Sequence, residues 1–123
     1  MALLKSTTVE GLHPFEAVLS YDNISKDTVT LISGQNLTAG TVLGKITASG
    51  KYTLHNNAAS DGSEVAAAVL AYDGDASGGD ASVVAITRLA EVKEDLLVWK
   101  TGISAPNKAA GIVALAAHFI IAR

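Results

Sequence analysis

Short apolar segments separated by turn-forming residues are the feature that most limits the possible folds of this chain. Thr28-Val29-Thr30-Leu31 alternates polar and apolar side chains, as a half-buried strand does, and Gly34-Gln35-Asn36 ends it with turn chemistry. The apolar run Ala66–Tyr72 is too short for a free-standing helix and predicts a buried strand. The other predicted strands are Val42–Ile46, Tyr52–Leu54, Ser82–Leu89 and Leu96–Trp99. The pattern predicts a mainly β (α+β) protein.

A single helix is predicted near the end of the chain. Ser104 is suited to cap a helix that starts near Ala105, and Pro106 falls in the first turn, where its missing N–H costs nothing. The helix is expected to bury the face that carries Ala109, Ile112, Val113 and Ala116, which follow i, i+3, i+4, i+7 spacing. A terminal strand over His118–Ala122 is expected to follow it.

Two glycines inside these predicted elements indicate close packing. Gly44 interrupts the strand Val42–Ile46, which suggests a bulge or a close approach of two backbones. Gly111 weakens the helix by about 1 kcal/mol relative to Ala. Because it has no side chain, Gly111 also allows a neighbouring backbone on the sheet or on another subunit to come close.

The composition indicates one domain with a modest core. The 123 residues are 49% hydrophobic but only 5% aromatic, so much of the apolar content is Ala and Val. Burying such small side chains stabilises a fold less than burying Leu or Phe does. Association of subunits would extend this core and stabilise the fold by mass action.

Charge and residue usage argue against several classes of protein. A formal net charge of -3 argues against a phosphate-binding surface, so nucleic acid is not an expected partner. With no Cys, the chain has no disulfide framework, zinc-thiolate site or thiol nucleophile. Neither a secretory signal nor an apolar run of membrane-spanning length is visible, so no membrane partner is expected.

The residues that could carry chemistry do not form a complete site. Asp73-Gly74-Asp75-Ala76-Ser77-Gly78 resembles the start of a calcium loop, but Val84 stands where a bidentate Glu is needed. The pattern therefore favours a solvated connection between strands, with calcium binding as the alternative. His13, His55 and His118 are far apart, and none lies in a metal-binding motif. We expect no catalytic residue, no cofactor and no metal.

The chain divides into a predicted arm and a body. Residues 1–20 mix polar and isolated apolar residues, which predicts a flexible, extended N-terminal arm. Residues 21–123 form the predicted β-rich domain. A mixed charge cluster within it, at Glu91, Lys93, Glu94 and Asp95, favours a solvated edge that prevents unwanted sheet pairing, and the alternative is a docking patch.

The order of blocks from Gly40 to Arg123 resembles the lambda-type head decoration proteins of tailed bacteriophages. The blocks that carry the resemblance are Ala39–Ile46, Val65–Leu70, Glu91–Trp99, Asn107–Val113 and Phe119–Ile121. The resemblance implies a compact fold of the β-clip kind. It also implies a homotrimer at three-fold and quasi-three-fold sites on the outer surface of an expanded head, where it stabilises the shell against internal genome pressure.

The resemblance further implies a partner, a location and a role for the arm. The partner is the major capsid protein, and the protein is made in the host cytoplasm before it joins the virion. In this family the arm orders against the capsid protein, and backbone groups of the arm could add a strand to a capsid edge. The candidate arm contacts in this chain are Val9, Leu12, His13, Pro14 and Phe15.

Two residues of the body are candidate anchors of either the trimer interface or the core. Trp99 is the only Trp, and large aromatic residues serve both roles. Ile112 lies on the predicted helix face. The alternative functions are a β-clip-type trimeric nucleotide hydrolase, whose motifs the chain lacks, and another small binding module, such as a lipoyl-type carrier modified at Lys45 or Lys51.

Overall fold

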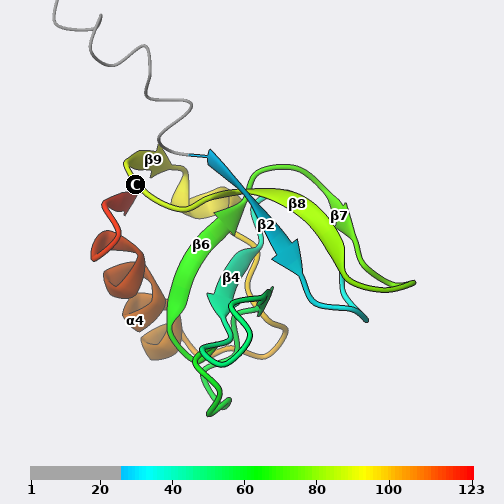
Figure 1. The fold of residues 1–123 in the computed structure, drawn as a ribbon. Coiled ribbons are helices and arrows are strands. Elements are labelled where there is room, and N and C mark those ends of the chain that lie inside the picture. Colours follow the sequence, from blue (N-terminus) through cyan, green and yellow to red (C-terminus); the bar gives the residue numbers. More distant parts are fainter. Residues whose placement is uncertain (1–25) are drawn as a thin grey trace, which may run out of the picture.

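The short apolar segments form a closed barrel of five strands in the computed structural model, which describes residues 26–123 (Figure 1). The barrel order is β2-β5-β4-β6-β8, and its pairings are antiparallel except between β2 and β5. The barrel strands are β2 (Lys26–Leu31), β4 (Val42–Lys45), β5 (Tyr52–Leu54), β6 (Ala66–Leu70) and β8 (Ala81–Ile86). The mainly β fold with one C-terminal helix is confirmed.

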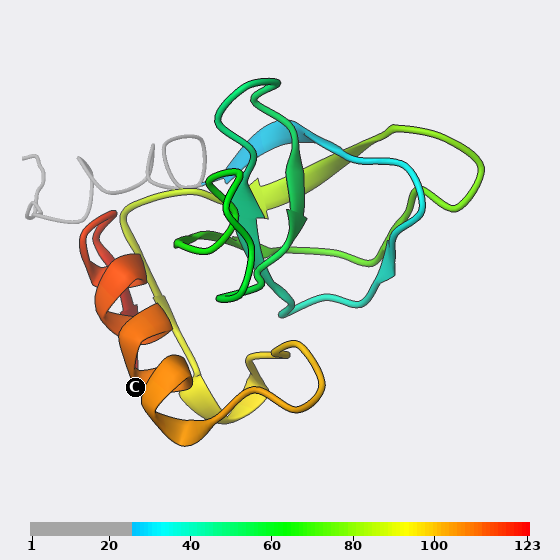
Figure 2. The ribbon, with the colours of Figure 1, turned by 90° about the horizontal axis from the view of Figure 1, so that it is seen from below.

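The remaining elements of residues 26–123 are two small sheets and two helices. Strands β3 (Asn36–Leu37) and β7 (Gly74–Asp75) form one antiparallel pair. The C-terminal unit comprises β9 (Ala90–Val92), the 3-10 helix η1 (Glu94–Leu96), α4 (Ala105–Ala116) and β10 (Ile120–Ala122). Within it, β9 and β10 pair in parallel. Figure 2 shows α4 running beside β9, to one side of the barrel.

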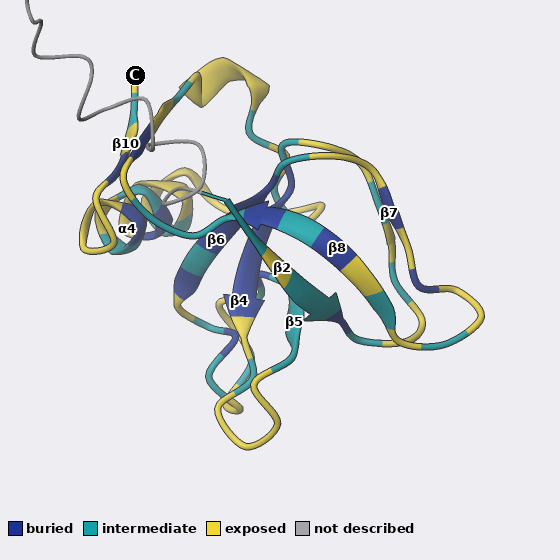
Figure 3. Cartoon of the chain, turned by 45° about the horizontal axis from the view of Figure 1, so that its top comes forward, coloured by how far each residue is buried: buried dark blue, intermediate teal, exposed yellow. Residues whose placement is uncertain are grey.

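The barrel interior is filled by alternate residues of its strands. Along β8, Val83 and Ala85 are buried whereas Val84 and Ile86 are only partly covered, as the two-residue period of a strand requires. Leu31, Leu43 and Leu70 are the largest side chains of this cluster and are essentially inaccessible to solvent. Figure 3 shows the buried positions of β4, β6 and β8 in dark blue.

Strand β6 carries a second hydrophobic cluster on its outer face. There Ala66 and Val69 pack with Val42, and with Leu115 of α4 and Ile120 of β10. Because β6 is covered on both sides, its sequence is continuously apolar, as is usual for doubly buried strands. The predicted buried strand in this region is confirmed.

Gly44 confirms the predicted close approach of two segments. The pairing of β4 with β6 shifts register between Leu43 and Gly44, which marks a bulge. A Cβ placed at Gly44 would lie 2.6 Å from Cα of Ser63. Any larger residue would therefore push the loop before β6 away from the barrel.

The predicted face of the helix is wrong. Gly111 and Leu115 are the buried residues of α4, whereas Val113 is 70% exposed and Ala109 and Ala116 are also exposed. Ile112 is half-buried. The buried stripe follows i, i+4 spacing because the ring of Trp99 covers Gly111, a position that a search for apolar residues does not select.

Some of the predicted strands and loops also differ from those observed. The strand expected at Leu96–Trp99 is replaced by η1 and a single parallel bridge between Thr41 and Val98. The terminal strand starts at Ile120, because the residues before it form the turn that ends α4. The loop expected over residues 73–80 contains the short strand β7.

Replacing Gly111 by Ala should destabilise the protein, although Ala favours helix by about 1 kcal/mol. The added Cβ would lie 2.5 Å from Cζ3 and 2.6 Å from Cη2 of Trp99, which forces the ring to move. We expect a loss of about 1–3 kcal/mol, typical of overpacking. Urea unfolding measures this. In a Trp99→Leu background the same substitution should be neutral or stabilising, and equal losses in both backgrounds would exclude the steric explanation.

Stability should fall as the pH drops below about 6.5, the usual pKa of His. His55 is 2% exposed, and its Nε2–H donates to the Glu64 carbonyl at 3.0 Å while Nδ1 has no partner among the described residues. Burial lowers the pKa of His55. The unfolded chain therefore binds the proton first, so the contribution of His55 is fully present above pH 6.5 and is lost as the pH falls toward the lowered pKa.

Chemical denaturation between pH 5 and 8 measures this dependence. His55→Gln should remove most of the slope, because an amide can still donate to Glu64 but does not titrate. His118→Gln is the matched control, since His118 is exposed. A slope that survives in His55→Gln would show that another group is responsible.

Candidate interaction surfaces

The carboxylates of the Asp-rich loop serve its own structure. Asp73 accepts from the Ala39 N–H at 2.8 Å, and Asp75 accepts from the N–H and hydroxyl of Ser77 at 2.9 and 2.6 Å. Asp80 pairs with Lys51 at 2.6 Å. These donors lower the pKa of Asp75 and of Asp80. Across residues 26–123, no three His, Cys, Asp or Glu side chains gather in a way that could hold a metal ion.

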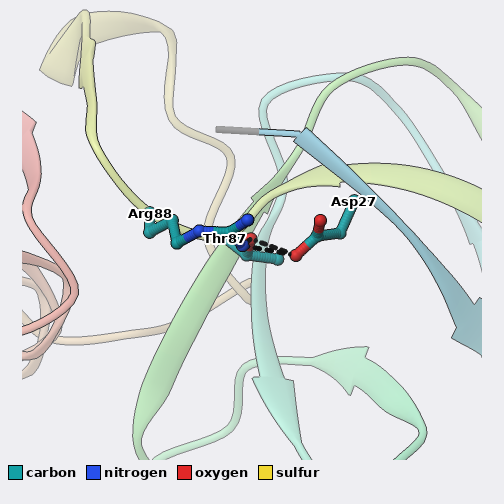
Figure 4. Close-up of polar contacts among 3 residues, drawn as sticks. All are labelled: Asp27, Thr87 and Arg88. Atoms are coloured by element: carbon teal, nitrogen blue, oxygen red, sulfur yellow. Dashed lines mark hydrogen bonds and ion pairs between the residues drawn. The ribbon is translucent and has the colours of Figure 1, made fainter. Parts of the chain in front are cut away.

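A polar cluster links β2 to the residues that follow β8. Oδ2 of Asp27 accepts from the Thr87 hydroxyl at 2.7 Å and from Nη1 of Arg88 at 2.6 Å (Figure 4). The Thr87 and Arg88 hydrogen bonds lower the pKa of Asp27. Because both charged side chains are about 40% exposed to water, the ion pair itself adds little stability. Its geometry fixes the direction in which the chain leaves β8 toward β9.

Two apolar residues beyond this cluster have unusual backbone conformations. Leu89 has a φ of 56° and Phe119 a φ of 63°, in the left-handed region that glycine favours. The Leu89 N–H donates to the His118 carbonyl at 3.4 Å, so the two sites are neighbours. Phe119 also lies in the turn that follows α4, a region where many helices use Gly. Backbone strain of this kind concentrates at functional sites.

We group these two residues with the exposed Val113 and Ile121 of the same C-terminal unit and call the group the C-terminal patch. Phe119 is 65% exposed and Leu89 is 41% exposed. Val113 on α4 and Ile121 on β10 are exposed in the same unit of the fold. Apolar periodicity does not identify these exposed residues, although the sequence carries one signal. The predicted helix is followed by Phe119 where a helix-ending Gly is common.

A groove lies on the other side of β9. It has a volume of about 440 Å³ and runs between the end of β6, β9 and η1. Lys26, the first described residue, lines it. Glu91 and Lys93 also line it, so part of the predicted charge cluster borders this groove.

The predicted site residues fall into two groups. Val9, Leu12, His13, Pro14 and Phe15, and with them the arm over residues 1–20, lie outside the described residues. Trp99 is half-buried, packs on the cluster outside β6, and meets the ring of His55 edge-on at 5.8 Å. Trp99 and the half-buried Ile112 do not belong to the C-terminal patch, and a role for either at a subunit interface stays a prediction.

The comparison with protein families decides the class of protein. The model of the bacteriophage lambda head decoration protein D family matches residues 7–120, nearly the whole chain. This chain belongs to the lambda head decoration protein D family. No individual curated protein matches it in sequence. The resemblance seen in the sequence is confirmed.

Family membership assigns the general role. The chain is a phage head decoration protein, a structural component associated with the capsid of the virion. Among residues 26–123, no helix is long and apolar enough to cross a membrane. For a decoration protein, the relevant surfaces of the fold are those that can contact other proteins.

Replacing Phe119 by Gly should leave the stability of the isolated fold unchanged or raise it slightly. Gly relieves the left-handed strain, worth about 1–2 kcal/mol, and the lost side chain is 65% exposed. Thermal unfolding of the dilute protein measures this. As a control, Ile120→Gly should destabilise strongly, since Ile120 is fully buried. A large loss for Phe119→Gly would mean that Phe119 packs within its own subunit.

Proposed function

We propose that this decoration protein binds as a homotrimer to the outer surface of an expanded phage head, at three-fold and quasi-three-fold sites, and stabilises the shell against internal genome pressure. The main support for this proposal is the family match over residues 7–120. Packaged DNA loads the shell from inside, and a trimer that bridges neighbouring capsomers adds contact area across their seams. Many copies acting together give a large effect from individually weak contacts.

The C-terminal patch supports the trimer. Phe119 and Val113 expose most of their side chains, although such apolar groups gain free energy when they leave water. Leu89 and Phe119 combine left-handed backbone with exposed side chains. We assign the subunit contact to this patch, because association would bury it and extend a core otherwise built largely from small residues.

The N-terminal arm is the proposed contact with the major capsid protein. Val9, Leu12, His13, Pro14 and Phe15 supply apolar side chains, one imidazole and the rigid backbone of a proline. Extended backbone in this region can add a strand to a capsid edge, exchanging hydrogen bonds with water for ladder hydrogen bonds. The barrel and α4 are built from residues 26–123, so we expect the fold to form without these side chains.

Removing residues 2–15 should leave the melting temperature nearly unchanged and weaken binding to expanded shells at least tenfold. Co-sedimentation of the purified protein with expanded and unexpanded shells of its own phage measures the binding. Full-length protein should sediment with expanded shells only. Unchanged binding of the truncated chain would place the capsid contact on the folded body.

The same preparation tests the trimer. Phe119→Asp should reduce trimer formation in native mass spectrometry, because a carboxylate in an apolar contact is costly. Val65→Asp is the matched control, since Val65 is also apolar and 52% exposed but precedes β6, outside the patch. A protein that stays monomeric both in concentrated solution and on shells would contradict the trimer.

A further inference from the structure

The groove beside β9 has an apolar lining and an apolar rim. Ile86, Val92 and Leu97 contribute to its lining, while Tyr72 and Leu96 border it and are 58% and 67% exposed. Its volume of about 440 Å³ suits a few side chains of a peptide rather than a folded domain. Apolar residues gathered at the rim of a groove are compatible with a segment that covers it.

The groove is also bordered by an unpaired strand edge. In the parallel ladder with β10, the Ala90 N–H donates to the Phe119 carbonyl, and the Val92 carbonyl accepts from the Arg123 N–H. Because alternate residues of a parallel strand face opposite neighbours, the N–H and C=O of Glu91 point away from β10. Neither group has a backbone partner among residues 26–123. An extended peptide in the groove would supply both partners.

The sequence immediately before Lys26 contains a segment with the right pattern. Glu16-Ala17-Val18-Leu19-Ser20-Tyr21 places Ala17, Leu19 and Tyr21 at alternate positions, so a strand would present all three side chains on one face. Val and Tyr favour strands, and six extended residues span about 20 Å.

The connection and the charges favour the chain's own segment as the occupant. Residues 22–25 lie between Tyr21 and Lys26 and can span up to about 17 Å. Lys26 already lines the groove, and its Nζ lies 5.8 Å from the centroid of the Tyr72 ring. Asp22-Asn23 provides turn chemistry for a reversal of the chain. Residues 16–22 carry two acidic and no basic side chains, whereas Lys26 and Lys93 line the groove with one acid, Glu91.

We propose that residues 16–21 of the same chain dock as an extended strand in this groove, pair with the free edge of β9 at Glu91, and thereby fix where the N-terminal arm leaves the body. A short tether gives an intramolecular segment a high effective concentration, so it outcompetes the same segment of another copy. Residues 1–15 then project from the groove. Binding of the projecting residues 1–15 to the capsid rests on the proposed function. Docking of residues 16–21 in the groove does not, because it is a property of the free protein.

Disulfide trapping tests the docking directly, because the chain has no Cys of its own. In the full-length double variant Leu19→Cys with Leu96→Cys, mild oxidation without shells should link the two introduced thiols within one chain. Intact mass and non-reducing peptide mapping identify the link. The matched control is Leu19→Cys with Val65→Cys, since Val65 is also apolar and exposed but lies outside both the groove and the C-terminal patch. We expect the groove pair to react at least tenfold faster.

Each other outcome identifies a different arrangement and overturns the proposal. Equal rates for the two pairs would mean that the segment does not prefer the groove. Links only between chains would assign the groove to a neighbouring copy, and links formed only when shells are added would make docking a result of capsid binding. Because the assay uses free protein, failed decoration of shells alone would not affect its result.

Hydrogen exchange gives a second readout that does not depend on thiol chemistry. The Glu91 amide should exchange at least tenfold more slowly in the full chain than in Leu19→Asp, which places a carboxylate in the apolar groove. The Ala90 amide, which bonds to β10, should exchange equally in both proteins. Equal exchange at Glu91 would exclude pairing at this edge.

Discussion

The double burial of β6 is the constraint on which the rest of the structure depends. Its inner face completes the barrel core through Ala68 and Leu70, and its outer face receives α4 and β10 through Ala66 and Val69. Small residues are needed here because two layers must approach the same strand. The scarcity of large aromatic residues is therefore a consequence of the architecture. It also explains why the single Trp matters, since Trp99 fills the remaining space beside α4 by lying against Gly111.

Elements defined by local chemistry could be predicted from the sequence, and elements defined by distant contacts could not. The alternation at Thr28–Leu31 and the capping pair Ser104 and Pro106 act within a few residues, and they located β2 and the start of α4. The phase of α4 depends instead on Trp99, which reaches it from another part of the chain. Hydrophobicity alone predicts that Val113 is on the buried face of α4 and does not include Gly111 in that face.

The interaction surfaces were the least predictable part for the same reason. The family could be identified because the order of the blocks is a property of the sequence. The C-terminal patch includes two residues with left-handed backbone, Leu89 and Phe119. Only Phe119 is indicated by the sequence, because it follows the predicted helix where Gly is common. The free edge of β9 is formed by backbone N–H and C=O groups. Nearly every residue type has these groups, so the sequence does not indicate the edge. Its flanking charges, Glu91 and Lys93, predict a solvated edge that prevents unwanted sheet pairing, and both exposed residues also line the groove.

The attachment of β2 also has a mechanical consequence. Six residue pairs join β2 to β8, whereas only Leu31 and Tyr52 join β2 to β5. Tension that enters through the chain before Lys26 along the strand axis would load all the rungs of the β2–β8 ladder at once, in shear. The same tension applied sideways would open the ladder one rung at a time, starting where Asp27 holds Thr87 and Arg88. The direction of pull therefore determines how much force one decorating subunit can carry.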